Sequence, residues 1–294
     1  MSAIQPRRDR VLQGIAWILL AVALFAVVHV LVKRLGETYP VAQMMFFRSA
    51  FALLPALAMV LRHPRGLGVL RSASPLGHVA RSGFGIFAMA TTFAAFQYIP
   101  AADVVAINFA APIFVTALSV PLLGERVGWR RWCAVLAGFC GVLLIVRPGF
   151  AAVSLPMLYV VAGAALWACY QVILKVVGRT DGAATTGVWT AVVGAAFSSF
   201  AAWFAWTPPD ATGWALLVAA AIVGGVGHIV YSQAFNLAPA STLQPFNYLL
   251  LVYAAVLGWL FFGDVPDPWT IGGAAVVVCA GLYTFHRARL REGG

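Results

Sequence analysis

The sequence is poor in charged residues and poorest in acidic ones. Charged residues make up 10% of the 294, with 9 Asp and Glu against 19 Lys and Arg, whereas 62% are hydrophobic. A water-soluble domain of this length needs a larger charged surface, so the composition places the chain in a bilayer. None of the long apolar runs carries a carboxylate near its middle.

Motifs of several enzyme classes are missing as well. The chain has no Walker motif, no HExxH and no GxSxG, so it does not hydrolyse ATP by itself and lacks the common hydrolase signatures. The four cysteines, Cys133, Cys140, Cys169 and Cys279, form no CxxC, and we interpret them as apolar packing residues. We therefore expect a protein that is not an enzyme, with no cofactor and no metal ion.

Ten apolar runs are long enough to cross a hydrocarbon core. They cover residues 12–32, 41–61, 75–97, 101–123, 130–146, 153–175, 183–205, 212–235, 239–261 and 268–286. The predicted fold class is an all-α polytopic membrane protein with ten transmembrane helices and short loops. Arg7, Arg8 and Arg10 before the first run resemble a signal peptide, but the run is too long for one, so we interpret it as a span.

The positive charges predict an orientation. If the N-terminus is cytoplasmic, most of the 19 Lys and Arg fall on the inner side, where Arg81 is counted, and Arg48 lies inside a span. The outer side then holds only Lys33, Arg34 and Arg147. This asymmetry predicts a bacterial inner-membrane protein with both termini in the cytoplasm. The net charge of +10 then reflects contact with the anionic lipid bilayer, and we expect no nucleic-acid partner.

The chain also repeats itself. The segment at 95–101, AFQYIPA, returns at 234–240 as AFNLAPA, a shift of 139 residues, and the same shift relates Gly124 to Gly263. Earlier in each half the shift is 142, which relates Lys33 to Lys175. Two repeats of five spans, residues 1–149 and 150–294, must lie upside down relative to each other. Inverted repeats around a central cavity are typical of secondary transporters.

Two matching stripes of polar and aromatic residues follow from this repeat. Phe25, His29 and Lys33 share one helix face in the first half, and Trp167, Gln171 and Lys175 occupy the equivalent positions in the second. For the lysines, at the span ends, snorkelling to the interface is the preferred interpretation. For the other four residues we prefer a cavity-lining role to simple packing, because an imidazole and an amide in mid-span need water or a partner.

Arg48 lies about 10 Å inside the second predicted span at a rise of 1.5 Å per residue. A guanidinium at this depth suggests a carboxylate or phosphate on a solute. A structural role, capping backbone carbonyls, fits the sequence equally well. The nearest acidic residues, Asp103 and Glu125, lie near span ends.

Further candidates lie on the third, fourth, eighth and ninth spans. Aromatic and hydroxyl groups on facing helices suit an organic solute, although an aromatic packing seam would look the same. Prolines near the two equivalent asparagines would free backbone carbonyls, although the amides would serve interhelical hydrogen bonds equally well. These candidate substrate-binding residues are Thr92, Phe96, Asn108, His228, Tyr231, Asn247 and Tyr248.

One stretch is specific enough to indicate a family. Gly124-Glu125-Arg126-Val127-Gly128-Trp129, continuing to Pro148-Gly149, resembles the helix 4–5 region of EamA-type transporters of the drug/metabolite transporter superfamily. Leu166-Trp167-Ala168 is similar to the helix 6 opening of that family. The resemblance implies ten helices, two inverted repeats, a central cavity and alternating access for amino acids, other metabolites or drugs. Phe25 departs from the family pattern, which often has Trp there.

The predicted function is a permease for a small organic solute, most simply an amino acid or another zwitterionic or anionic metabolite. We expect uniport or exchange first and proton coupling through His29 or His228 second. Two rival hypotheses are a membrane-embedded enzyme acting on a lipid-linked substrate and a scaffold or sensor that transports nothing. A homodimer stays open, because the glycines of the fifth and tenth spans suit dimer contacts and internal packing equally: Gly138, Gly141, Gly272, Gly273 and Gly281.

Overall fold

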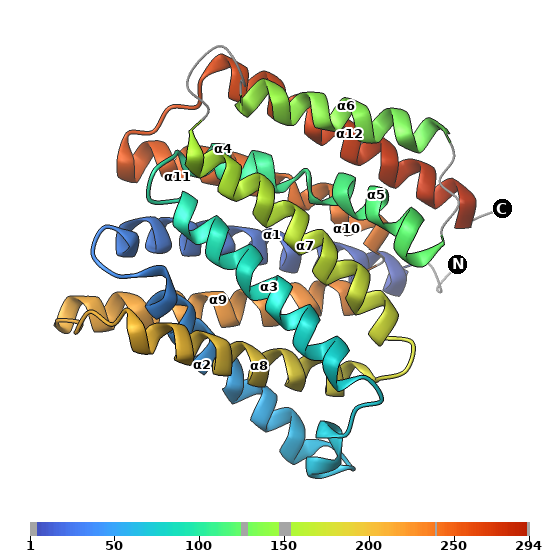
Figure 1. Ribbon diagram of the computed structural model, residues 1–294. Coiled ribbons are helices and arrows are strands. Elements are labelled where there is room, and N and C mark those ends of the chain that lie inside the picture. Colours follow the sequence, from blue (N-terminus) through green and yellow to red (C-terminus); the bar gives the residue numbers. More distant parts are fainter. Residues whose placement is uncertain (1–4, 125–128, 147–153, 239, 293–294) are drawn as a thin grey trace.

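The structure, a computed structural model, describes residues 5–124, 129–146, 154–238 and 240–292. Within these ranges the chain is helical, with no strand (Figure 1). The first half holds α1 (Gln5–Gly36), α2 (Val41–Arg62), the 3₁₀ helix η1 (Gly66–Leu70), α3 (Pro75–Ala95), α4 (Ala101–Asn108), α5 (Ala111–Leu123) and α6 (Trp129–Val146). The second half holds α7 (Leu155–Val177), α8 (Ala183–Phe204), α9 (Ala211–Leu237), α10 (Ala240–Asn247), α11 (Leu249–Phe262) and α12 (Pro268–Glu292).

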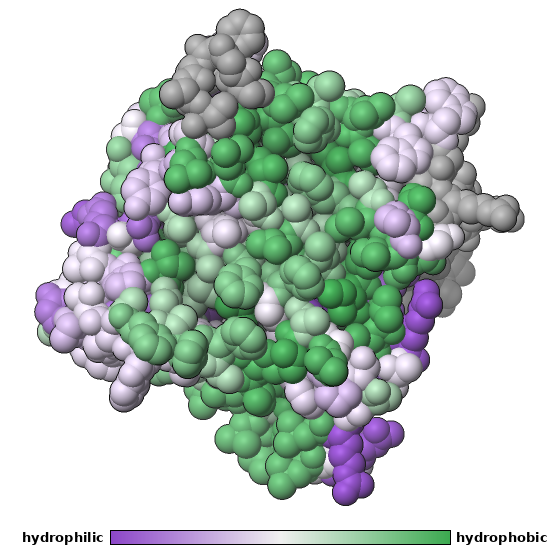
Figure 2. All heavy atoms as spheres, viewed as in Figure 1, coloured by the Kyte–Doolittle hydropathy of each residue, from purple (hydrophilic) through white to green (hydrophobic). Residues whose placement is uncertain are grey.

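The helices form a multi-pass membrane protein. Seven helical stretches in the described part of the chain are long and apolar enough to span a bilayer. The helix α3 is not among them because His78 and Arg81 lie near its start, and the apolar parts of α6 and α12 are shorter. Apolar residues cover the middle of the face in Figure 2, and hydrophilic residues gather at its left and right edges, as expected for a surface in contact with lipid.

The two halves share their helix breaks and helix ends. The interruption between α4 and α5 falls at Phe109, and the one between α10 and α11 falls at the equivalent Tyr248. Pro112, at the start of α5, cannot donate a hydrogen bond to a preceding turn, which explains the first break. Helices α5 and α11 both end at a left-handed glycine, Gly124 with φ 66° and Gly263 with φ 70°.

The main helix contacts join one half to the other. The helix α1 packs most extensively on α9, and α7 packs equally on α3, as the repeat requires. The pairs α2–α8 and α6–α12, each made of equivalent helices, complete the strongest contacts. The repeats are therefore interleaved rather than separate lobes. The predicted repeat boundary at 149/150 lies outside the described residues.

Most of the glycines that could serve either dimer contacts or internal packing pack inside the molecule. A Cβ atom added to Gly141 would lie 2.8 Å from the carbonyl oxygen of Gly273, so α6 and α12 meet at backbone contact. Gly138 lies against Ile113. Around Gly272 the described residues leave open space. Internal packing accounts for Gly138, Gly141 and Gly273 without a second copy of the chain.

Both ends of the described chain lie on one side of the molecule. Helix α1 begins and α12 ends at the right-hand edge of Figure 1, and we refer to this side as the terminal end. The opposite side, with the α1–α2 turn (37–40) and the α8–α9 loop (205–210), is the far end.

Candidate functional site

A cation and an imidazole meet between α2 and α9. The Nη2 atom of Arg48 lies 3.0 Å from Nε2 of His228. A guanidinium can only donate hydrogen bonds, so Nε2 of His228 must accept and the ring proton must lie on Nδ1. Among its contacts in the described chain, Arg48 thus has a neutral partner, and its charge is available to an anionic ligand.

Aromatic rings surround this pair. The ring of Phe25, on α1, lies 5.0 Å from His228 and 6.0 Å from Tyr231 between centroids. The Tyr231 hydroxyl is hydrogen-bonded by the side chain of Asn247. One turn further along α1, His29 lies 4.8 Å from the ring of Phe96, at the end of α3. The structure therefore brings together six residues that the sequence nominated: Phe25, His29, Arg48, Phe96, His228 and Tyr231.

Between this cluster and the far end the molecule is tightly packed. The cavity beside Arg48 has a volume of about 10 Å³, about the room one water needs. Its walls are apolar: Val28, Val32, Leu35, Met44, Phe93, Leu217, Ala220 and Ala221. The passage from Arg48 to the far end is closed.

Polar contacts reinforce the closed far end. Gln43, which is fully buried, donates to the carbonyl oxygen of Thr207 at 2.9 Å and accepts from its amide at 2.9 Å. The Tyr39 hydroxyl donates to Oδ1 of Asp210 at 3.2 Å, and Asp210 also caps α9. Burial, followed by this hydrogen bond, raises the pKa of Tyr39 above its ordinary 10.0. These contacts tie the start of α9 to the α1–α2 turn.

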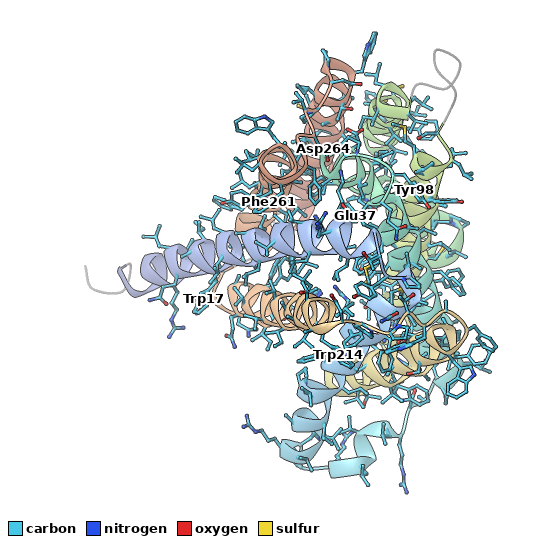
Figure 3. All side chains as sticks on the ribbon, turned by 90° about the vertical axis from the view of Figure 1, so that its left-hand side faces the viewer. Trp17, Glu37, Tyr98, Trp214, Phe261 and Asp264 are labelled. Atoms are coloured by element: carbon cyan, nitrogen blue, oxygen red, sulfur yellow. The ribbon has the colours of Figure 1, made fainter. Side chains whose placement is uncertain are left out.

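An ion pair adds a second tie at the same end. The Lys33 ammonium pairs with the Asp264 carboxylate and lies 4.7 Å from the centre of the Phe262 ring. Figure 3 views the molecule from this side, with Asp264 above the end of α1 and Trp214 below it. Lys33 is therefore paired rather than simply extended to the interface.

The cluster is accessible from the terminal end. On one face of α7, Val160 and Ala164 are fully buried, but Trp167 and Gln171, one and two turns nearer the terminal end, are exposed. The same change occurs on α9, where Leu217 and Ala221 are buried and His228 is exposed. Both helices therefore change from buried to exposed along one face, and we interpret this change as an approach to the cluster from the terminal end.

Some nominated residues do not join the cluster. The Thr92 hydroxyl donates to Ala88 in its own helix, at the crossing with Gly163 of α7. Tyr248 packs on Phe109 at 4.8 Å and against Gly281 of α12. Asn108 ends α4 and is half-buried there. Trp167 stacks on Tyr170 at 4.6 Å, while Gln171 faces the accessible space.

A second cation inside a helix was not among the predicted site residues. Arg81, counted there with the inner surface, is fully buried in α3. Its guanidinium donates to the Tyr170 hydroxyl at 3.0 Å, to the Thr186 carbonyl at 3.0 Å and to the Thr190 hydroxyl at 2.5 Å. Its position six residues after the start of a predicted span, similar to that of Arg48, could have indicated that it lies inside the helix bundle.

Near Arg81, the α7–α8 turn is fastened to the start of α3. Asp181 accepts hydrogen bonds from the Ser72 hydroxyl at 2.5 Å and the Ala73 amide at 3.1 Å, and lies 2.9 Å from Nε2 of His78. The bond from Ser72, with smaller contributions from Ala73 and His78, lowers the pKa of Asp181 from 3.8 to about 2. Asp181 is the repeat equivalent of Tyr39, so each end of the molecule carries a corresponding tie.

The interleaved repeats and their accessible polar centre define a multi-pass membrane protein of the transporter type. The chain belongs to the EamA-like transporter family, whose model matches residues 12–147 and again residues 154–285. This confirms the predicted family and its two repeats.

Curated relatives cover nearly the whole chain. It is 27% identical to an S-adenosylmethionine uptake transporter of Rickettsia prowazekii, over 94% of this chain and 93% of the relative. It is 30% identical to a riboflavin transporter of Rhizobium johnstonii (99% and 96%) and 28% identical to the pseudopaline exporter CntI of Pseudomonas aeruginosa (92% and 95%). A solved crystal structure with 20% identity has a similar fold, with a TM-score of 0.61 over 95% of this chain and 97% of that one.

Proposed function

We propose that the chain is a secondary transporter that moves a small organic metabolite across the bacterial inner membrane by alternating access. The observation that carries the proposal is Arg48 with its neutral partner His228, at the closed end of a path that is open toward the terminal end. A partly buried cation whose partner in the described chain is a neutral imidazole, with aromatic side chains around it, suits a solute with a negative group and a flat or apolar part.

Ten spans in two inverted repeats are part of this proposal. Counting α4 with α5, and α10 with α11, as one broken span each gives ten spans within the described residues. In Figure 1, α1 runs from right to left and the equivalent α7 runs from left to right, which supports the inversion. The positive-inside rule then puts the terminal end in the cytoplasm, so the structure is the inward-facing state.

The solute we favour is larger than a simple amino acid. The names of the relatives point to S-adenosylmethionine, riboflavin and pseudopaline, and the first two carry ring systems. In our proposal Arg48 holds the negative group, Phe25 and Tyr231 contact the ring, and Trp167 and Gln171 line the approach. Thr92 and Tyr248 stabilise the helices around the path, and His29, Asn108 and Asn247 supply orienting polar groups.

The moving bodies would be mixed bundles. The helix α9 is tied to α1 and α2, and α3 is tied to α7 and α8. Each bundle therefore contains helices of both repeats. The contact between His29 of one bundle and Phe96 of the other lies on the boundary and would break when the far end opens.

For energy coupling we propose uniport or exchange, with proton coupling through His228 as the second candidate. One observation favours that candidate: a proton on Nε2 of His228 would break its contact with Arg48. Transport in sealed vesicles that is indifferent to a proton gradient would eliminate it.

The test is ligand-dependent stability followed by transport. Purified protein would be heated with S-adenosylmethionine, riboflavin, amino acids and aromatic carboxylates in turn. A solute at one hundred times its dissociation constant should add about 2.7 kcal/mol of stability. A shift for one chemical class that disappears in Arg48→Gln, together with counterflow of that solute in proteoliposomes, supports the proposal. Counterflow that continues unchanged in Arg48→Gln would remove Arg48 from the site.

A further inference from the structure

Arg81 occupies a place that corresponds to that of Arg48 in the other half. The repeat shift of 142 makes Thr190 on α8 the equivalent of Arg48 on α2, and Thr190 is the residue that Arg81 contacts at 2.5 Å. The shift of 139 makes Ala220 on α9 the equivalent of Arg81, and Ala220 lines the small cavity beside Arg48. The α2–α9 interface and its repeat equivalent, the α8–α3 interface, thus hold one arginine each. In the first the arginine comes from α2, and in the second it comes from α3, which is the equivalent of α9.

The two arginines also lie at opposite depths. Arg48 is about 10 Å from the start of α2 at the far end, and Arg81 is about 10 Å from the start of α3 at the terminal end, at 1.5 Å per residue. The two arginines differ in their exposure. Arg48 is only partly buried at the end of the accessible path, whereas Arg81 is fully buried.

The charge of Arg81 is left without an anion. In the described chain its hydrogen-bond partners are two hydroxyls and a carbonyl, and its Nε atom has no partner. The nearby carboxylate, Asp181, is taken by Ser72, Ala73 and His78. A buried guanidinium that has hydrogen bonds and the Tyr170 ring but no counterion is costly, which is consistent with an anion that binds it in another state.

The repeats explain which state that is. In transporters built from inverted repeats, the opposite-facing state arises when the two repeats exchange conformations. The α8–α3 interface then becomes accessible, as the α2–α9 interface is now, and it opens toward the far end. We propose that Arg81 is a second anion-binding residue, which holds the negative group of the solute in the outward-facing state while Arg48 is closed off. This inference rests on the proposed function.

The experiment uses the full chain in membranes, with the four cysteines replaced. Thr190→Cys places a thiol beside Arg81, and His228→Cys places one beside Arg48. Each is labelled with a membrane-impermeant methanethiosulfonate reagent, one bearing a sulfonate and one a trimethylammonium group. Right-side-out vesicles expose the outer side and inverted vesicles the inner side. Leu35→Cys, buried in the far-end seal, reports whether that end opens at all.

We expect Thr190→Cys to react from the outer side. Relative to a free thiol in solution, the anionic reagent should be favoured by about tenfold, because opposite unit charges a few ångströms from a cation differ by this much even in water. The preference should vanish in Arg81→Gln. In inverted vesicles, His228→Cys should show the same preference because of Arg48.

Three results would overturn the inference or its basis. If Leu35→Cys reacts from outside and Thr190→Cys does not, the far end opens without exposing Arg81, and the inference alone fails. If the two reagents modify Thr190→Cys in the same ratio as they modify a free thiol in solution, Arg81 is no anion site; this comparison is decisive even if Arg81→Gln does not fold. If Leu35→Cys never reacts from outside, alternating access fails, and the proposed function fails with it.

Discussion

Phe109 and Tyr248 occupy the same position in the two repeats, and their rings lie in contact with centroids 4.8 Å apart. Each sits at the break of its broken helix, between α4 and α5 or between α10 and α11. Two equivalent residues can touch only where the pseudo-symmetry axis passes between them. An exchange of conformations between the repeats would leave this contact in place, so it marks the centre about which the bundles move.

Replacing Arg48 by glutamine should reduce transport of an anionic solute by at least about tenfold. A hydrogen bond to a charged group contributes about 1.5–3 kcal/mol, and glutamine cannot supply the charge. The melting temperature should change little, because the partner of Arg48 is the neutral His228. Counterflow in proteoliposomes measures the effect, and Arg34→Gln, at an exposed arginine paired with Glu37, is the matched control. Equal losses in both variants would speak against a site at Arg48.

Replacing Gly141 by alanine should destabilise the protein by about 1–3 kcal/mol, as overpacking does. The added Cβ atom would lie 2.8 Å from a backbone carbonyl, which has no room to yield. Gly272→Ala, one residue from Gly273 but facing open space, should leave stability unchanged or raise it slightly. Thermal unfolding in detergent compares the two variants. An equal response would mean that α6 and α12 do not meet at Gly141.

The tie at Asp181 should make stability depend on acid. The folded pKa of about 2 lies below the unfolded value of 3.8, so the carboxylate favours the folded state. Its contribution is fully present above about pH 4 and is lost as the pH falls toward 2. Melting temperatures of the wild type and Asp181→Asn should therefore differ at pH 6 and approach each other as the pH falls to about 2. A constant difference across this range would rule out Asp181 as the titrating group.

The Lys33–Asp264 pair should show measurable coupling. Both side chains are largely buried, at 15% and 20% exposure, and the ammonium also lies over the Phe262 ring. We expect a double-mutant cycle with Lys33→Gln and Asp264→Asn to give about 1 kcal/mol, more than an exposed pair contributes. The Arg34–Glu37 pair, 65% and 50% exposed, supplies the comparison and should give almost none. Coupling no larger than in that exposed pair would show that Lys33 does not fasten the far end.

The helices could be predicted because each apolar run is visible in its own stretch of sequence, and the repeat showed which helices of the two halves are equivalent. The two left-handed glycines lie at positions that the repeat relates. The helix breaks did not follow, because residues 101–123 and 239–261 were each predicted as one continuous span, whereas the structure interrupts them near Pro112 and Pro245. The packing partner of each helix could not be predicted, because a shift of 139 residues shows that two helices are equivalent but not which helices are in contact. Only packing shows that α1 contacts α9.

Part of the residue cluster around Arg48 was also predictable. Phe25, His228 and Tyr231 share helix faces that the spacing indicates, and they meet in the structure. The Thr92 hydroxyl donates within its own helix, as threonine hydroxyls often do, so a role in binding stays a prediction for this residue. Arg81 escaped notice because a charge count assigns a residue to a side and says nothing about its burial.

The interleaving of the repeats has a consequence for biosynthesis. The helix α1 is made first, but its main partner, α9, follows almost two hundred residues later in the chain. During translation the first five spans must therefore remain in the bilayer with their eventual contact faces covered only by lipid or by the insertion machinery. Assembly is completed late, when the second repeat arrives and threads its helices between those already in place.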